Sequence, residues 1–220
     1  MSLPKEIVPN PLVTSTIEIR YKSKLDTTEL LPKVFSTFLN DFPKIEQSKI
    51  PAELRKNEPR FEYSSEQILV NEDYRLGVGS NVIIFEVASE YKLWNHFFGV
   101  VSKCLPKFFE IGHIDLITRI GIRYASVLDK SEGIGQVTNF KPFLNIPGYI
   151  EKFENLRTNL IVNDYNLFLQ INEKANAKKD DKSISGVYID IDASYTKDMP
   201  VDNDVLTIID NLHSAQKKLF

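Results

Sequence analysis

The chain has 220 residues, of which 42% are hydrophobic and 26% are charged, with 11 prolines and 9 glycines. This composition is typical of a folded globular protein and excludes the disordered and collagen-like classes. The formal net charge is −3, and acidic and basic residues are interspersed. That pattern argues against a nucleic-acid partner, because phosphate binding depends on clustered lysine and arginine.

The chain contains one cysteine, Cys104, so neither an intrachain disulfide nor a cysteine-rich zinc site is possible. We therefore expect a cytoplasmic location. Its apolar neighbours Val101, Leu105 and Phe108 predict a buried, unreactive thiol. Every apolar run is too short to cross a bilayer, and the first residues lack the pattern of a secretory signal, so we expect no membrane association.

In the first part of the chain, residues 16–21 alternate apolar and polar side chains and predict a half-buried strand. Asp26 and Glu29 have the spacing of a capping box, which predicts a helix that Pro43 ends. The expected apolar stripe of this helix is Leu31, Phe35, Phe38, Leu39 and Phe42. Residues 48–59 are expected to form an exposed connection.

Four short strands are predicted next, at residues 60–64, 68–70, 74–78 and 82–88, as an antiparallel meander with hairpin chemistry at Gly77 and Gly79. A strongly apolar helix follows, which Pro106 is expected to bend or end. Its stripe is Trp94, Phe97, Phe98, Val101, Leu105 and Phe108.

The second part begins with a predicted strand at residues 117–127, followed by an irregular connection over 129–150. Strands are expected within 155–172 and 183–193, joined by a solvated lysine-rich loop. That loop contains Lys174, Lys178, Lys179 and Lys182, with Asp180 and Asp181 among them. A final amphipathic helix, capped by Asp202 or Asp204, carries Val205, Ile208, Ile209, Leu212 and Leu219. We expect the natural chain to continue beyond Phe220, because no helix-ending signal precedes it.

Three blocks of the first half recur in the same order in the second half. Residues 16–21 resemble 119–124, residues 68–76 resemble 160–167, and residues 82–89 resemble 187–194. We interpret this as a duplication with halves at about 12–112 and 117–220, although shared strand composition could also produce it.

The predicted fold class is α+β, with residues 1–220 in a single domain. Each half reads as strand, helix or loop, meander, helix, which favours one largely antiparallel sheet with the helices on one face. A TATA-binding-protein-like arrangement is the alternative, because its elements follow the same order.

If the helices cover the isoleucines of these strands, a set of charged side chains shares the opposite face. The set is Glu18, Arg20, Arg119, Arg123, Asp190 and Asp192. It could be a solvated surface held by cross-strand ion pairs, or it could bind a partner or an anionic ligand through Arg20 and Arg123.

Few residues suggest catalysis or a cofactor. Asp190 and Asp192 share a strand face and could bind a divalent metal, but two carboxylates are too few, and an ion pair with Arg119 or Arg123 is favoured. His96, His113 and His213 match no metal-ligand spacing. We therefore expect no catalytic residues, no metal site and no cofactor.

Several short motifs resemble those of a sporadically distributed prokaryotic protein family of unknown function. They are Pro11-Leu12-Val13, Glu18-Ile19-Arg20, Tyr91-Lys92-Leu93-Trp94, Gly121-Ile122-Arg123-Tyr124, Ile189-Asp190-Ile191-Asp192 and Leu212-His213. Ala125 and Ser126 stand where that family has Ile-Asn. The resemblance spans nearly the whole chain and implies a soluble, uncharacterised bacterial or archaeal protein. It does not indicate any particular activity.

We therefore expect a non-enzymatic binding or interaction module for a protein or small-molecule partner. One alternative is a metal-dependent hydrolase or nucleic-acid-processing enzyme that uses Asp190 and Asp192. Another is a small-ligand carrier with an apolar pocket beside Trp94. The oligomeric state does not follow from the sequence.

Overall fold

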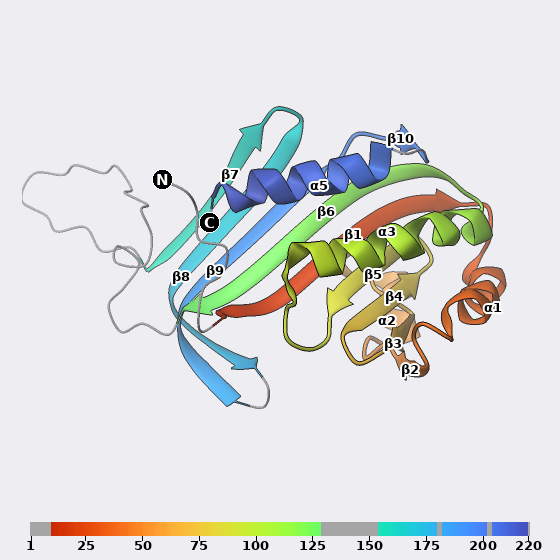
Figure 1. Ribbon diagram of the computed structural model, residues 1–220, viewed down its shortest axis with the longest axis horizontal. Coiled ribbons are helices and arrows are strands. Elements are labelled where there is room, and N and C mark those ends of the chain that lie inside the picture. The colour runs from red at the N-terminus through yellow and green to blue at the C-terminus, as the bar shows by residue number, and fades with distance from the viewer. Residues whose placement is uncertain (1–9, 129–153, 180–181, 202–203, 220) are drawn as a thin grey trace, which may run out of the picture. The chain divides into compact units, whose positions relative to one another are not determined.

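The computed structural model describes residues 10–128, 154–179, 182–201 and 204–219 (Figure 1). These residues contain four helices and a sheet of ten strands, so the predicted α+β class with a large antiparallel sheet is confirmed. The helices are α1 (Thr27–Phe38), α2 (Ala52–Asn57), α3 (Leu93–Gly112) and α5 (Asp204–Lys217), with a 3₁₀ turn at Pro59–Phe61. The strands are β1 (Leu12–Ser23), β2 (Lys44–Gln47), β3 (Gln67–Val70), β4 (Tyr74–Gly79), β5 (Val82–Val87), β6 (Ile114–Leu128), β7 (Asn155–Val162), β8 (Tyr165–Lys179), β9 (Lys182–Tyr195) and β10 (Met199–Pro200).

The hydrogen-bonded order of the strands is β2-β3-β4-β5-β1-β6-β9-β8-β7, and β10 also pairs with β6. The first repeated block lies in the adjacent strands β1 and β6. The third block lies in β5 and β9, and the second lies in the hairpins β3–β4 and β7–β8. A duplicated unit would give this order. The duplication, the single domain and the TATA-binding-protein-like arrangement stay predictions.

The chain divides into two compact units. The smaller unit comprises Met1–Thr14 and Arg123–Asp192, and the larger unit comprises Ser15–Ile122 and Ala193–Phe220. The division falls within β1, β6 and β9, so each unit has its own part of these strands.

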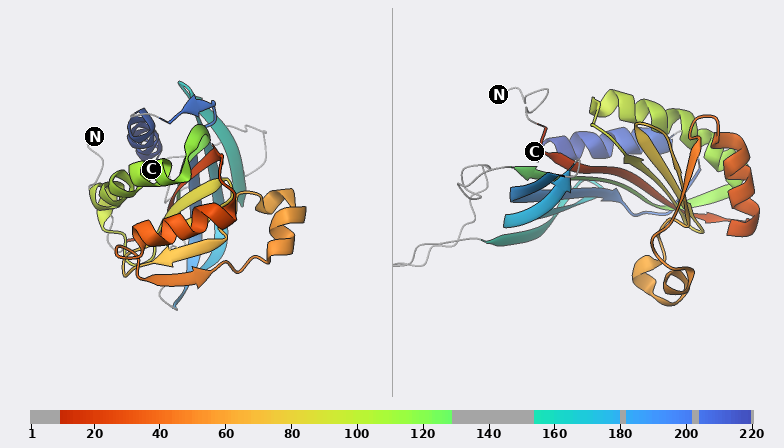
Figure 2. Two further views of the ribbon diagram at one scale, coloured as in Figure 1. Left: turned by 90° about the vertical axis from the view of Figure 1, so that its right-hand side faces the viewer. Right: turned by 90° about the horizontal axis from the view of Figure 1, so that it is seen from below.

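In the larger unit, the apolar face of β1 is fully buried, as its alternation predicts. Ile17, Ile19 and Tyr21 are at most 1% exposed, and the Tyr21 ring meets the edge of Phe108 on α3 with centroids 5.4 Å apart. α5 lies beside α3 on the same side of this part of the sheet (Figure 2). The α3 side chains that complete this core are Phe97, Val101, Cys104, Leu105 and Phe109.

The start of α1 was predicted more accurately than its buried face. Asp26 caps α1 by accepting bonds from the backbone N–H groups of Thr28 and Glu29, and the Glu29 side chain completes the predicted capping box. The buried residues of α1 are Leu30, Val34 and Phe38. The predicted stripe is therefore wrong at Leu39, which is 43% exposed, and its members Leu31 and Phe35 are only half-buried. The fully buried row repeats every four residues from Leu30.

Pro106 neither ends nor breaks α3, which runs on to Gly112. Its ring is exposed, so the carbonyl that loses its helical partner can be hydrated, while the buried neighbours Leu105 and Phe108 hold the helix on the sheet. His113 follows with a left-handed backbone, φ 47°, as the C-terminal cap.

Three other predictions are corrected by the structure. Residues 60–64 form the end of the 3₁₀ helix and a turn that follows it rather than a strand, and the expected connection at 48–59 contains α2. The lysine-rich loop is shorter than predicted, because β8 extends to Lys179 and β9 begins at Lys182. β2 is an additional strand that was not predicted, because all four of its residues are exposed and give no buried-strand pattern. The connection predicted at 129–150 and the cap at Asp202 lie outside the described residues.

The smaller unit has its own apolar cluster on β8 and β9. The buried members are Leu169, Ile171, Val187, Ile189 and Ile191, with Leu128 and Leu156 packed against them. β7 and β8 form a hairpin whose register pairs Val162 with Tyr165 across the two-residue turn Asn163-Asp164. Asn163 has φ 56°, which asparagine tolerates better than most residues.

Candidate functional site

In the larger unit, the polar face of β1 carries a carboxylate shared by two arginines. Glu18 Oε1 accepts a hydrogen bond of 2.7 Å from Arg20 Nε and another of 2.7 Å from Arg119 Nη1 on β6. The side chains of Glu18, Arg20 and Arg119 are 22%, 30% and 15% exposed. All three side chains are partly desolvated, and Arg119 has a further interaction of its own.

Besides its hydrogen bond to Glu18, the Arg20 side chain contacts an aromatic ring. Its guanidinium lies over Tyr63, 4.0 Å from the ring centroid, a geometry that attracts a cation to the electron-rich ring face. Burial is the largest cause that raises the pKa of Tyr63, followed by the charge of Glu62. Tyr63 therefore remains a neutral phenol at neutral pH.

Two glycines allow the segment that carries Tyr63 to cross this face of β4. A Cβ on Gly79 would lie 2.5 Å from the carbonyl oxygen of Ser64, and a Cβ on Gly77 would overlap Ser65 Oγ. α2, in the same segment, lies on the opposite side of the sheet from α3 (Figure 2). The sequence indicates turn chemistry at these glycines; what they provide is close approach of a second backbone.

A third glycine makes room for Arg119. Gly121 lies two residues along β6 on the same face, and a Cβ there would overlap the Arg119 guanidinium. Neither this role of Gly121 nor that of Tyr63 was predicted from the sequence. Gly121, in the Gly-Ile-Arg-Tyr motif, was a visible signal of the close approach to Arg119. No pattern in the sequence indicated the contact of Tyr63 with Arg20, because the segment of Tyr63 was predicted to be a strand.

A second ionic group lies on the same face of the larger unit. Arg75 on β4 approaches Glu46 on β2 at 3.9 Å and Glu86 on β5 at 4.0 Å. Burial raises the pKa of Glu86, while Arg75 opposes that rise. These pairs are long, so they contribute less to stability than the short contacts around Glu18.

In the smaller unit, Arg123 and Asp190 form a two-point ion pair. Arg123 Nε donates to Asp190 Oδ1 at 2.9 Å and Nη2 donates to Oδ2 at 2.7 Å. The Tyr188 hydroxyl donates to Oδ2 at 3.0 Å. The Asp190 side chain is only 7% exposed, whereas that of Arg123 is 50% exposed. The hydrogen bonds to Asp190 are the main cause that raises the pKa of Arg123, so its charge is fixed.

The six residues of the predicted face therefore form two groups. Glu18, Arg20 and Arg119 meet in the larger unit, and Arg123 pairs with Asp190 in the smaller unit. Asp192 lies on the same strand as Asp190, and it has interactions of its own. The assignment of all six to one binding surface stays a prediction.

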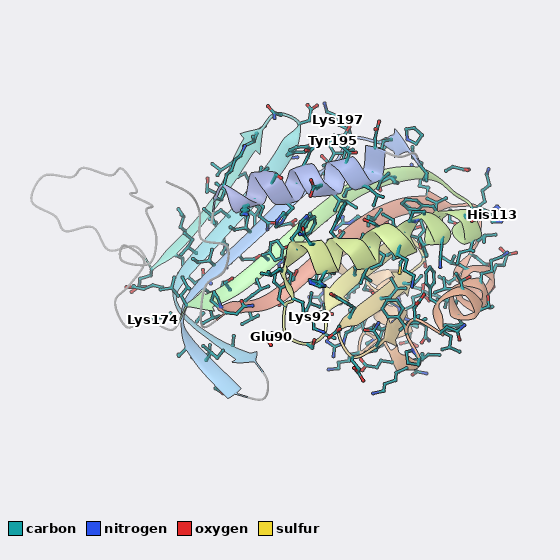
Figure 3. The ribbon with its side chains drawn as sticks, in the orientation of Figure 1. Glu90, Lys92, His113, Lys174, Tyr195 and Lys197 are labelled. Atoms are coloured by element: carbon teal, nitrogen blue, oxygen red, sulfur yellow. The ribbon has the colours of Figure 1, made fainter. Side chains whose placement is uncertain are left out.

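No three metal-binding side chains converge among the residues that the structure describes. Both oxygens of Asp190 already accept hydrogen bonds from Arg123. Figure 3 shows two of the residues considered in the sequence: His113 at the C-terminal end of α3, and Lys174 on β8. Lys92 precedes the N-terminal end of α3. Cys104 is 2% exposed, and burial raises the pKa of its thiol to about 11, which makes it a poor nucleophile.

A pocket of about 390 Å³ lies in the larger unit, between the C-terminal half of α3 and the start of α5. Its lining residues are Leu105, Pro106, Phe109, Glu110, Ile114, Val201, Val205 and Leu206. The predicted neighbour Trp94 is not among them. Its indole instead stacks on Phe98 with centroids 5.1 Å apart and on His213 with centroids 4.0 Å apart.

No family model, curated protein or solved structure matches the chain. Among the described residues, no helix has both the length and the apolar character needed to cross a membrane.

Proposed function

We propose that the protein is a non-enzymatic binding module that holds an anionic group of its partner, a carboxylate or a phosphate, at Arg20. The observation that carries the proposal is the fixed guanidinium of Arg20. Its Nε is bonded to Glu18 and its plane lies over Tyr63, while no hydrogen bond joins its terminal nitrogens to another described residue. Those N–H groups form the fork that pairs with oxyanions.

The guanidinium of Arg20 supports an anion in preference to a cation, because it offers only N–H donors and a positive charge. One carboxylate, Glu18, faces the two guanidinium groups of Arg20 and Arg119 at 2.7 Å each. Arg119 has a further interaction of its own, so the anion is expected at the terminal N–H groups of Arg20. Because Arg20 is held in place before the ligand arrives, little side-chain entropy is lost on binding.

Calorimetric titration at low salt tests the proposal with three probes: inorganic phosphate, acetate and a glutamate-rich peptide. We expect Arg20→Gln to weaken the tightest of these by about tenfold or more, since a charge-assisted hydrogen bond is worth about 1.5–3 kcal/mol. Lys33→Gln is the matched control, because it removes the same charge from the exposed side of α1. Absence of binding by all three probes, or equal losses in the two variants, would show that Arg20 is not an anion site.

A second candidate function, a small-ligand carrier, is supported by the pocket at α3 and α5. Its volume of about 390 Å³ falls within the range of small-molecule sites, and all of its lining residues except Glu110 are apolar by type. Leu206→Trp would narrow the pocket and should weaken uptake of an apolar fluorescent probe, whereas Ile161→Trp, on β7, should not. The metal-dependent hydrolase has no such support, since Asp190 is already paired.

A further inference from the structure

β7 is the last strand in the sheet order, and one of its two edges is paired with β8. Glu173 N donates to Glu154 O at 2.8 Å, so residue 154 belongs to a hydrogen-bonded pair at the start of this ladder. Hydrogen-bonded pairs alternate in antiparallel strands, so residues 156, 158, 160 and 162 also bond to β8. The N–H and C=O groups of Asn155, Arg157, Asn159 and Ile161 therefore point away from β8, and no other strand in the described chain pairs with them.

The other end of the sheet is protected in a way that β7 is not. β2 has four residues, Lys44–Gln47, and two of them are charged. β7 has eight residues with one charge, Arg157. Ile161 is 77% exposed and Val162 is 41% exposed. Natural proteins usually block an open edge with charges, proline or a short length, because a free edge recruits another strand.

We propose that β7 pairs antiparallel with β7 of a second copy of this chain, which joins two sheets across a twofold axis. In the proposed register, Thr158 lies opposite its own counterpart. Arg157 then lies opposite Asn159, and Leu156 opposite Leu160. The outward-pointing odd-numbered residues form the hydrogen-bonded pairs of the new ladder, as the backbone requires.

The sequence of β7 favours this register over its neighbours. A shift that centres the axis on Arg157 places two guanidinium groups opposite each other, which is unfavourable. Centring on Thr158 or on Asn159 gives equally long overlaps of β7, but only the Thr158 register pairs threonine with threonine and leucine with leucine. These leucines lie on the face of the buried cluster, since Leu156 packs against it and Leu160 is paired with the buried Leu167. The second copy would thus extend an apolar layer that ends at β7.

One strand pair buries less surface than a standard stable interface, so the dimer is weak and depends on concentration. The interface involves neither Arg20 nor the pocket, and the inference is independent of the proposed function.

Proline provides the sharpest test. Asn159→Pro removes an outward N–H and leaves the bonds to β8 intact, which is the position in an edge strand where proline is tolerated. Asn159→Thr is the matched control, because it keeps the N–H. In sedimentation equilibrium from about 1 μM to about 1 mM, we expect wild type and Asn159→Thr to dimerise and Asn159→Pro to bind at least tenfold more weakly. A wild-type monomer throughout, or a dimer that proline leaves unchanged, would overturn the proposal; circular dichroism checks that each variant is folded.

Cross-linking tests the register. Thr158 and its counterpart would form a non-hydrogen-bonded pair with Cα atoms about 4.5 Å apart, close enough for a disulfide. Under a mild oxidant, Thr158→Cys should therefore give a covalent dimer. Asn155→Cys should not, since its two copies would lie about 20 Å apart. Equal cross-linking of the two variants would exclude this register.

Discussion

The imidazole ring of His213 on α5 lies flat against the indole ring of Trp94 on α3, with centroids 4.0 Å apart and planes 8° apart. The Trp94 Nε1–H group donates to Asp210 Oδ1 at 2.8 Å, so one indole contacts two side chains of α5. Burial lowers the pKa of His213 to about 4, with Lys217 acting in the same direction and Asp210 opposing both. The histidine is therefore neutral in the folded protein at neutral pH.

Because of His213, the free energy of unfolding should decrease as the pH is lowered from about 6.5 to about 4. Its folded pKa of about 4 lies below the ordinary value of 6.5, so the unfolded chain takes up the proton first as the pH falls. The contribution is complete above pH 6.5 and is lost progressively below it. We expect about 1–2 kcal/mol, since solvent still reaches part of the ring. Urea denaturation at pH 7, 5.5 and 4.5 measures the loss.

His213→Phe is the control for this prediction, because it keeps an aromatic ring on Trp94 and removes the titrating group. Carboxylates elsewhere also titrate at low pH, so the informative quantity is the difference between the two proteins. The variant should lose less free energy of unfolding between pH 7 and pH 4.5. Parallel pH profiles would mean that His213 does not titrate in this range.

Local rules predicted the elements of this fold well. The period of two in β1 and the capping box at Asp26 and Glu29 each depend on residues close together in the chain, and both are present. The sequence failed where tertiary packing decides. Pro106 stays inside α3 because the helix is held by its buried face, a fact that no local propensity contains.

The candidate site shows the same limit. The charged residues of β1 and β6 were predictable from alternation, and so was an ion pair at Asp190. The partners of Glu18 were not, because one of them depends on strand order: Arg119 reaches Glu18 on the neighbouring β1. Tyr63 comes from a segment that crosses β4, and only the close approach at Gly77 and Gly79 reveals that crossing.

Tyr21→Phe should destabilise the protein by about 1–2 kcal/mol. The Tyr21 hydroxyl is buried and donates to the carbonyl of Gly79 at 2.8 Å, so its removal loses a buried hydrogen bond. Tyr74→Phe is a matched control: its ring stacks on Phe97, and no hydrogen bond joins its hydroxyl to another described residue. Thermal denaturation should separate the two variants, and equal losses would argue against the Tyr21 bond.

Gly79→Ala should lower the free energy of unfolding more than Gly121→Ala does. At Gly79 the new methyl group meets the Ser64 carbonyl at 2.5 Å and Val82 Cγ1 at 3.1 Å, and backbone must move. We expect a loss of about 2–3 kcal/mol, as for overpacking in a core. At Gly121 the methyl group meets the flexible end of Arg119, so we expect less than about 1 kcal/mol, with the Arg119–Glu18 bond displaced. Chemical denaturation compares them, and a larger loss at Gly121 would contradict this reasoning.

Arg123→Ala should destabilise the smaller unit more than Asp190→Ala. Loss of Arg123 leaves a carboxylate that is only 7% exposed with Tyr188 as its remaining side-chain donor, whereas loss of Asp190 leaves a guanidinium that is half exposed and can be hydrated. We expect about 2–3 kcal/mol for the arginine and about 1 kcal/mol for the aspartate, below the range for fully buried pairs. The double variant measures the coupling, expected at about 1–2 kcal/mol. If the two losses simply add, the short contacts at 2.7 Å and 2.9 Å contribute no net stability, and the pair is better explained as a solvated surface contact.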